Sequence, residues 1–246
     1  MLLLIIVAIT SYTLMHVIEM ASIGSRVAGR IKKRVALGTT LQQSIKTASV
    51  FLLVPFLPTL GYLVESGISV ENYLKIVFFA FFLSFLFSIL MIIKLNTLQS
   101  FFQVVFNKYT LNTIPIAIVK SFINKDLDLI SEKCRVFSFD KIIIKKTLVS
   151  LLAYLFLITG FFIAFFLAII FPENRLTMSQ FTATFHGFGA VIFAFYLDPM
   201  LSRSIDALEN DEAWLKNVYS ILLGRALSYF CVTLLLILYF LYKFLS

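Results

Sequence analysis

Long runs of mainly apolar residues alternate with polar segments along the whole chain. A helix needs about 20 such residues to cross the hydrocarbon core of a bilayer, and six runs reach that length. We therefore predict an all-α, polytopic membrane protein with six transmembrane helices, forming a single membrane domain over residues 1–246. The predicted spans cover residues 2–18, 45–64, 73–95, 143–171, 178–197 and 218–241. The first run lacks the basic start and cleavage site of a secretory signal, so we expect it to remain a span.

Polar residues interrupt some of these runs. Pro55 and Pro58 lie inside the second run, where each removes a backbone donor and predicts a kink or a break. The fifth run is the most polar and carries His186 near its middle. Such spans often face a cavity, although prolines are also common in membrane helices that are purely structural.

Two amphipathic regions lie between the predicted spans. Residues 20–41 read as a cationic interfacial helix, and residues 96–142 form a cytoplasmic interfacial segment with two apolar patches too short to cross a membrane. We expect the patches to lie flat on the membrane, with basic residues of the segment facing anionic lipid head groups. These basic residues are Lys108, Lys120, Lys125, Lys133, Arg135 and Lys141.

Composition and charge agree with a membrane protein. Hydrophobic residues make up 60% of the chain, against roughly 45–50% in soluble domains. Of the 21 Lys and Arg residues, 18 lie in or beside the first, third and fifth connections, and only Lys75, Arg175 and Lys243 lie on the other side. The positive-inside rule places those connections in the cytoplasm and both termini outside. Because the surplus of basic residues follows the membrane topology, we expect no nucleic-acid partner.

Common catalytic signatures are absent from the sequence. It contains no phosphate-binding G-x-x-x-x-G-K-[ST] loop, no G-x-S-x-G elbow and no H-E-x-x-H pair. Cys134 and Cys231 differ in setting and suggest neither a disulfide framework nor a metal cluster. We therefore expect a protein without enzymatic activity, cofactor or metal.

Basic residues near the cytoplasmic ends of several spans form the strongest candidate site. A helical bundle can bring them together around one anionic head group, and arginine suits a diphosphate because its planar fork binds phosphate through two hydrogen bonds. Each residue alone is also explained as a positive-inside residue. Arg225 stands out because it follows Gly224 in a connection with an acidic surplus. The predicted head-group residues are Arg26, Arg30, Lys46, Arg203 and Arg225.

A second group of ionisable residues suggests a polar path or a proton relay. His16 and Glu19 lie three residues apart, on one face of a helix. They are either functional, because ionisable groups within a membrane are costly, or simply hydrated at the interface. His186 is either a relay or a neutral hydrogen-bond partner. Asp198 and Asp206 complete the predicted path.

Short motifs near the two ends of the chain resemble those of a known family. The N-terminal motifs are His16-x-Ile18-Glu19, Arg26-x-Ala28-Gly29 and Arg34-x-Ala36, and the C-terminal ones are Asp198-Pro199-x-Leu201-Ser202, Asp206 and Gly224-Arg225. In order and separation they resemble the Amj family of bacterial lipid II flippases. Lys46-Thr47-Ala48-Ser49 stands where the family has an Arg-Thr-Ser-Asn-like segment, and Leu223 replaces a glycine. From Phe78 to Leu167 the resemblance is one of hydropathy alone.

The resemblance implies a flippase in the bacterial inner membrane. Such a protein moves lipid II, the undecaprenyl-diphosphate-linked peptidoglycan precursor, to the outer leaflet for cell-wall synthesis. Its expected partners are lipid II and anionic membrane lipids, with homo-oligomerisation left open. Two alternatives remain: an intramembrane enzyme acting on polyprenyl phosphates, with His16, Glu19 and Asp198 as acid and base, and a structural membrane adaptor.

Overall fold

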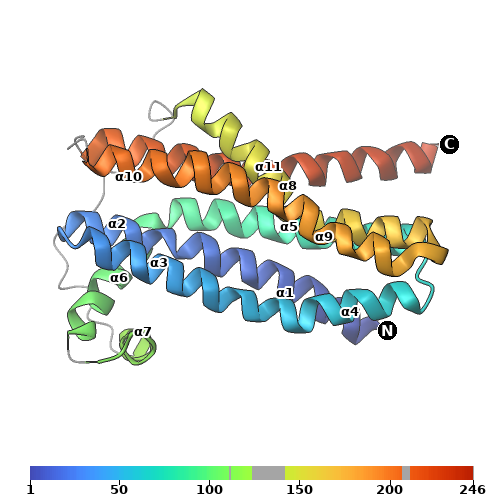
Figure 1. Ribbon diagram of the computed structural model, residues 1–246, viewed down its shortest axis with the longest axis horizontal. Coiled ribbons are helices and arrows are strands. Elements are labelled where there is room, and N and C mark those ends of the chain that lie inside the picture. The colour runs from blue at the N-terminus through green and yellow to red at the C-terminus, as the bar shows by residue number, and fades with distance from the viewer. Residues whose placement is uncertain (111, 124–141, 207–210, 246) are drawn as a thin grey trace. The chain divides into compact units, whose positions relative to one another are not determined.

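The computed structural model describes residues 1–110, 112–123, 142–206 and 211–245, with the side chains of 204–206 left aside (Figure 1). Every regular element in these ranges is helical, and six of the described helical segments are long and apolar enough to cross a membrane. The prediction of an all-α protein with six spanning helices is thereby confirmed. The six segments are Leu2–Ile31, Val35–Glu65, Val70–Ile93, Ile144–Ile170, Pro172–Arg203 and Asp211–Leu245.

The helices follow one another with short connections. In chain order they are α1 (Leu2–Ala21), α2 (Ile23–Ile31), α3 (Val35–Ser49), α4 (Leu53–Glu65), α5 (Val70–Ile93), α6 (Leu95–Tyr109), α7 (Ile114–Ile123), α8 (Ile144–Ile170), α9 (Arg175–Ile192), α10 (Asp198–Asp206) and α11 (Asp211–Leu245). By their contacts they group into two compact units. Unit 1 comprises Met1–Leu14, Leu52–Ile89 and Ser138–Ser246, and unit 2 comprises Met15–Phe51 and Leu90–Phe137.

Aromatic side chains fill the interior of unit 1. The ring of Tyr12 in α1 lies 4.9–5.6 Å from the rings of Phe56, Phe81 and Phe162, which come from α4, α5 and α8. A buried tyrosine hydroxyl needs a partner, and that of Tyr12 donates to the carbonyl oxygen of Ile158 at 3.1 Å. The aromatic core therefore joins four helices of this unit.

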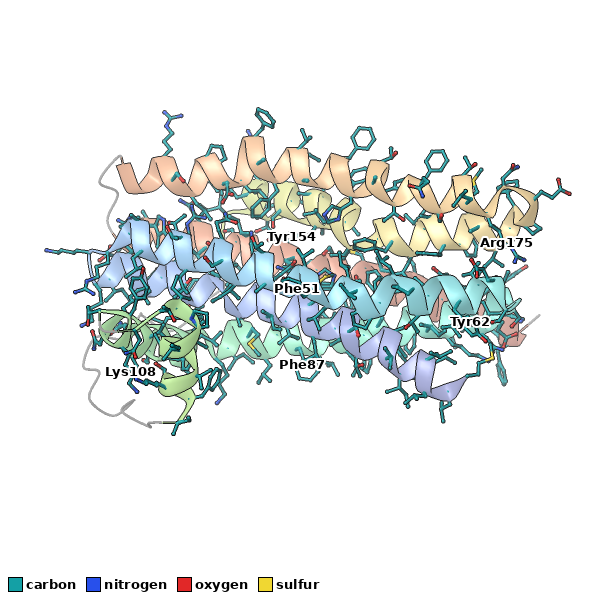
Figure 2. The ribbon with its side chains drawn as sticks, turned by 60° about the horizontal axis from the view of Figure 1, so that its bottom comes forward. Phe51, Tyr62, Phe87, Lys108, Tyr154 and Arg175 are labelled. Carbon is teal, nitrogen blue, oxygen red and sulfur yellow. The ribbon has the colours of Figure 1, made fainter. Side chains whose placement is uncertain are left out.

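The outward faces of the spanning helices are apolar as well. Phe51, Tyr62 and Phe87 are exposed, and Figure 2 shows their positions along the helices. Lipid tails are as apolar as such side chains, so exposure that would be unfavourable in water is not unfavourable in a bilayer.

Proline positions explain two irregular helical turns. The second span is interrupted by a 3-10 turn at Val50–Leu52, and Pro55 follows in the first turn of α4, where its missing N–H has no acceptor within the helix. Between α9 and α10 the chain forms a π-helical turn, Phe193–Leu197, and the N–H of Asp198 donates to the carbonyl of Phe193. Pro199 is the second residue after this wide turn, and the helix continues beyond it instead of ending at residue 197 as predicted.

Unit 2 is built around a close helical hairpin. A Cβ atom on Gly29 of α2 would lie 2.8 Å from Gly38 Cα in α3, so the two backbones touch. The hydroxyl of Ser25 donates to the carbonyl of Gly38 at 3.0 Å. The turn between the helices contains Lys33 with a φ of 55°. Helix α3 thus begins at Val35, ten residues before the predicted start of the second span, and part of the predicted interfacial helix belongs to it.

Helices α6 and α7 complete unit 2. The small side chains of Ala28 and Ala117 pack with apolar side chains of α3 and α6, among them Leu41, Phe102 and Phe106. Helices α6 and α7 are amphipathic and too short to span, with 15 and 10 residues. Residues 124–141, which hold the predicted basic residues Lys125, Lys133, Arg135 and Lys141, lie outside the described residues.

Ion pairs and a hydrogen bond connect several helix ends at one end of unit 1. The carboxylate of Glu71, at the start of α5, contacts the amines of Lys75 and of Lys243, which lies near the end of α11. Arg175, at the start of α9, donates to the carbonyl oxygen of Glu65, at the end of α4. The α4–α5 and α8–α9 connections and the end of α11 therefore face the same side, as six alternating spans require.

The arrangement predicts the accessibility of single cysteines in a Cys134→Ser, Cys231→Ser background. Ser69→Cys and Glu173→Cys are expected to react with an impermeant thiol reagent added outside intact cells, because their connections carry few basic residues. Lys33→Cys, in the cationic α2–α3 turn, is expected to react only after the membrane is permeabilised. Outside labelling of Lys33→Cys with protection of Ser69→Cys would contradict this orientation.

Candidate functional site

Helices α8 and α11 of unit 1 meet along a seam of polar side chains. The hydroxyl of Ser150 donates to the carbonyl of Ile221 at 2.8 Å, and the amine of Lys146 donates to the side-chain oxygen of Asn217. The residues recur at spacings of three or four on each helix, so they line one face of each. Within a bilayer, polar groups of this kind need partners in the protein, and the seam provides them.

Gly224 sets how closely the two helices approach. A Cβ atom at this position would lie 2.5 Å from the carbonyl oxygen of Thr147 and 2.6 Å from the Cβ of Ser150. Real side chains do not make such short contacts, so the seam requires glycine here. Further along α8, a Cβ on Gly189 of α9 would lie 2.7 Å from the carbonyl oxygen of Ala153. Helix α8 is therefore held closely by α11 and by α9.

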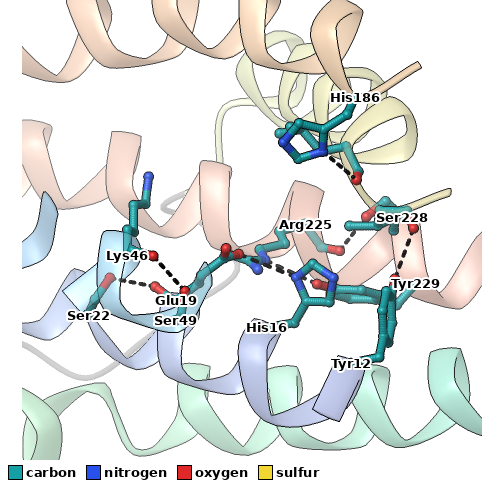
Figure 3. A network of polar contacts seen from close by, with 12 residues as sticks. Tyr12, His16, Glu19, Ser22, Lys46, Ser49, His186, Arg225, Ser228 and Tyr229 are labelled. Atoms are coloured by element: carbon teal, nitrogen blue, oxygen red, sulfur yellow. Dashed lines mark hydrogen bonds and ion pairs between the residues drawn. The ribbon is translucent and has the colours of Figure 1, made fainter. Parts of the chain in front are cut away.

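Arg225 follows Gly224 and is buried in unit 1. Its side chain is only 1% exposed, and its Nε–H donates to the Tyr229 hydroxyl one turn later on α11, at 3.3 Å (Figure 3). Its Cζ atom lies 4.7 Å from the centre of the Tyr154 ring of α8. A desolvated guanidinium over an aromatic face makes a favourable cation–π interaction. The two tyrosines thus fix the plane of a permanently charged group within a spanning helix.

The other predicted residues of unit 1 do not share this degree of burial. Nδ1 of His186 lies 3.3 Å from the carbonyl oxygen of Leu157, and the imidazole ring packs against Phe161 at 5.4 Å. This geometry favours a hydrogen-bonding role in which Nδ1–H donates to the carbonyl. Asp198 is half-buried at the start of α10, Arg203 is exposed, and the side chain of Asp206 is outside the described set.

Unit 2 holds the remaining predicted residues. His16 and Glu19 of α1 are in contact, with 3.3 Å between Nδ1 and Oε2. Arg26 is buried at 3% exposure, and Arg30 lies half-buried one turn further along α2. Lys46 of α3 is also half-buried.

The hairpin register relates positions of α2 to positions of α3, with position 26 beside position 41 and position 30 beside position 37. Because Gly29 faces Gly38 and the helices run in opposite directions, residues before Gly29 lie beside residues after Gly38. Arg26, Arg30 and Lys46 belong to unit 2, whereas Arg203 and Arg225 belong to unit 1. The gathering of all five around one head group stays a prediction.

Sequence reasoning identified Arg225 but missed the groups that hold it. Tyr154 and Ser150 lie on α8, and their importance depends on which helices pack together. Tyr229 follows Arg225 by four residues, so the spacing alone could have indicated that contact. No three side chains of His, Cys, Asp or Glu gather as metal ligands anywhere in the part of the chain that the structure describes.

The close packing of the seam predicts that two glycine substitutions differ strongly in their effect on thermal stability. Gly224→Ala is expected to force α8 and α11 apart, and overpacking of about 1–3 kcal/mol corresponds to a fall of roughly 2–12 °C in the unfolding midpoint. Gly187→Ala in α9 is the control, because a Cβ there meets nothing within 4 Å. Thermal unfolding of the two purified variants in detergent gives the comparison. Equal midpoints would contradict close packing at Gly224.

No protein-family model, curated protein or solved structure matches the chain.

Proposed function

We propose that the protein is a flippase that moves lipid II, an undecaprenyl-diphosphate-linked peptidoglycan precursor, from the cytoplasmic to the outer leaflet of the bacterial inner membrane. The observation that carries the proposal is Arg225, a buried guanidinium held over an aromatic ring within a spanning helix. In this proposal its role is to bind the diphosphate without any covalent chemistry.

The cost of burying charge supports a functional role for this arginine. Burying an arginine within a spanning helix is costly, by up to about 2.5–3.5 kcal/mol at the bilayer centre on insertion scales, and such residues usually belong to a substrate or ion pathway. Moving the diphosphate is costly as well, because its negative charge must cross the same hydrocarbon core. A guanidinium beside the phosphate reduces the cost of burying that negative charge.

The position of Arg225 along α11 suits a cytoplasmic entrance. Eighteen residues separate it from Lys243, which lies at the end of unit 1 that the charge bias predicts to be outside. At 1.5 Å per residue this is about 27 Å, close to the roughly 30 Å thickness of the hydrocarbon core. Arg225 would then lie near the cytoplasmic boundary, where the lipid head group starts its passage.

Unit 2, taken by itself, also carries side chains of the kind that bind sugars and peptides. A shallow groove on α3 is lined by hydroxyl and amide side chains, including Thr40, Gln43, Ser44 and Thr47. These residues belong to a helical segment long and apolar enough to span a membrane. Hydroxyl and amide groups both donate and accept hydrogen bonds, which suits the sugars and peptide of lipid II. The groove overlaps Lys46–Ser49, the segment that resembles a polar motif of Amj proteins.

Transport by purified protein in liposomes tests the proposal. We expect labelled lipid II to become accessible on the opposite leaflet, with Arg225→Gln losing this activity. Arg225→Lys keeps the charge but not the fork and is expected to reduce the rate about 10–100-fold, since charged hydrogen bonds contribute about 1.5–3 kcal/mol. Lys216→Gln is the control: it removes a positive charge from the same helix nine residues earlier, on the opposite face.

Two results would oppose this function. Unchanged transport by a correctly folded Arg225→Gln protein would remove the observation on which the proposal depends. Release of phosphate or cleavage of the labelled lipid by the unmodified protein would instead indicate an intramembrane enzyme.

A further inference from the structure

An open cleft lies in unit 2 between the end of α6 and the start of α7. It is lined by Arg34, Leu37, Tyr109, Thr110, Asn112 and Thr113. Five of these side chains carry N–H or O–H donors, and only Leu37 is apolar. A concentration of donors around a guanidinium suits the non-bridging oxygens of a phosphate. None of these residues belongs to the head-group site proposed for transport.

Helix α7 presents two different faces beside this cleft. Ala117 and Ser121 are buried towards the interior of unit 2. Ile116, Val119, Phe122 and Ile123 are between 48% and 73% exposed. The helix has 10 residues and is about 15 Å long, so it cannot cross a bilayer. A short helix with an exposed apolar face is typical of an element that lies in the membrane interface.

Two lysines connect the cleft to the apolar face. The amine of Lys108 donates to the carbonyl oxygen of Lys120 at 2.9 Å, and the amine of Lys120 donates to the side-chain oxygen of Asn112 at 2.7 Å. The side-chain nitrogen of Asn112, Nδ2, donates in turn to the carbonyl oxygen of Lys108 at 2.8 Å. These bonds tie the end of α6 to α7 and hold two positive charges next to a residue that lines the cleft.

We propose that the α6–α7 hairpin is a lipid-binding element, in which the exposed face of α7 lies in the membrane interface and the Arg34 cleft binds the phosphate of an anionic phospholipid. The apolar face beside the cleft distinguishes a lipid from soluble phosphate, because acyl chains need such a surface and a free ion does not. The charges of Arg34, Lys108 and Lys120 select an anionic lipid over a zwitterionic one. This site is independent of the proposed transport function and would hold a lipid whether or not lipid II is moved.

Lipid binding by the purified full-length protein in neutral detergent tests the cleft. Native mass spectrometry is expected to show phosphatidylglycerol binding in preference to phosphatidylcholine. Arg34→Gln should weaken phosphatidylglycerol binding about fivefold, the effect of one basic residue at an anionic surface. Lys33→Gln is the matched control, because this neighbouring exposed cation does not line the cleft.

Either of two results in this experiment would overturn the cleft assignment. One is equal loss of binding in Arg34→Gln and Lys33→Gln, or no loss in either. The other is displacement of phosphatidylglycerol by inorganic phosphate in moderate excess, which would identify a soluble phosphate ligand instead.

The position of α7 is tested separately with an environment-sensitive fluorophore in the Cys134→Ser, Cys231→Ser background. A probe at Phe122→Cys is expected to shift its emission to shorter wavelength in vesicles containing phosphatidylglycerol, and less so in phosphatidylcholine alone. A probe at Asn107→Cys, an exposed polar position on α6, should stay in water in both. Aqueous emission at position 122 in both vesicles would contradict insertion of α7. If the probe at position 122 emits at the same short wavelength in detergent and in both vesicle types, it contacts protein and not lipid. This result would also overturn the proposal.

Discussion

The close approach of α8 and α11 at Gly224 is the constraint on which the candidate site depends. With no side chain at this position, the backbones come near enough for Ser150 to reach the carbonyl of Ile221 and for the Tyr154 ring to lie beside Arg225. Each of these contacts requires the same short separation. Lipid tails offer no replacement hydrogen bonds, so opening the seam would leave several polar groups without partners at once.

This constraint connects packing to the proposed function. A guanidinium stays charged in proteins, so Arg225 cannot be accommodated in a spanning helix by losing a proton. Tyr154 and Tyr229 hold its plane, and a fixed planar donor recognises phosphate better than a mobile point charge does. In unit 2 the same principle operates at Gly29 and Gly38, whose contact fixes the register of the hairpin that carries Arg26 and Lys46. Glycine thus has a structural role beside basic residues in both units.

The sequence predicted the spans best where hydropathy is uniform. The third and fourth were expected at residues 73–95 and 143–171, and the structure has α5 at Val70–Ile93 and α8 at Ile144–Ile170. The second span was misjudged at its start because Thr39, Thr40 and Gln43 lower the local hydropathy, although the helix continues through them. The end of the fifth was missed because a π-helical turn, which no hydropathy pattern reveals, carries the helix into Pro199. Arg225 was recognisable from its neighbours in sequence, whereas Tyr154 was not, because a contact between α8 and α11 is a property of packing.

The most direct test of the central claim is complementation in bacteria depleted of their own lipid II flippase. If this protein is a lipid II flippase, its expression is expected to restore growth and to make lipid II accessible at the outer face of the membrane. The Arg225→Gln variant, present in the membrane at equal abundance, should restore neither. Failure of the unmodified protein to restore outer-face accessibility, despite normal abundance and the predicted orientation, would contradict the account.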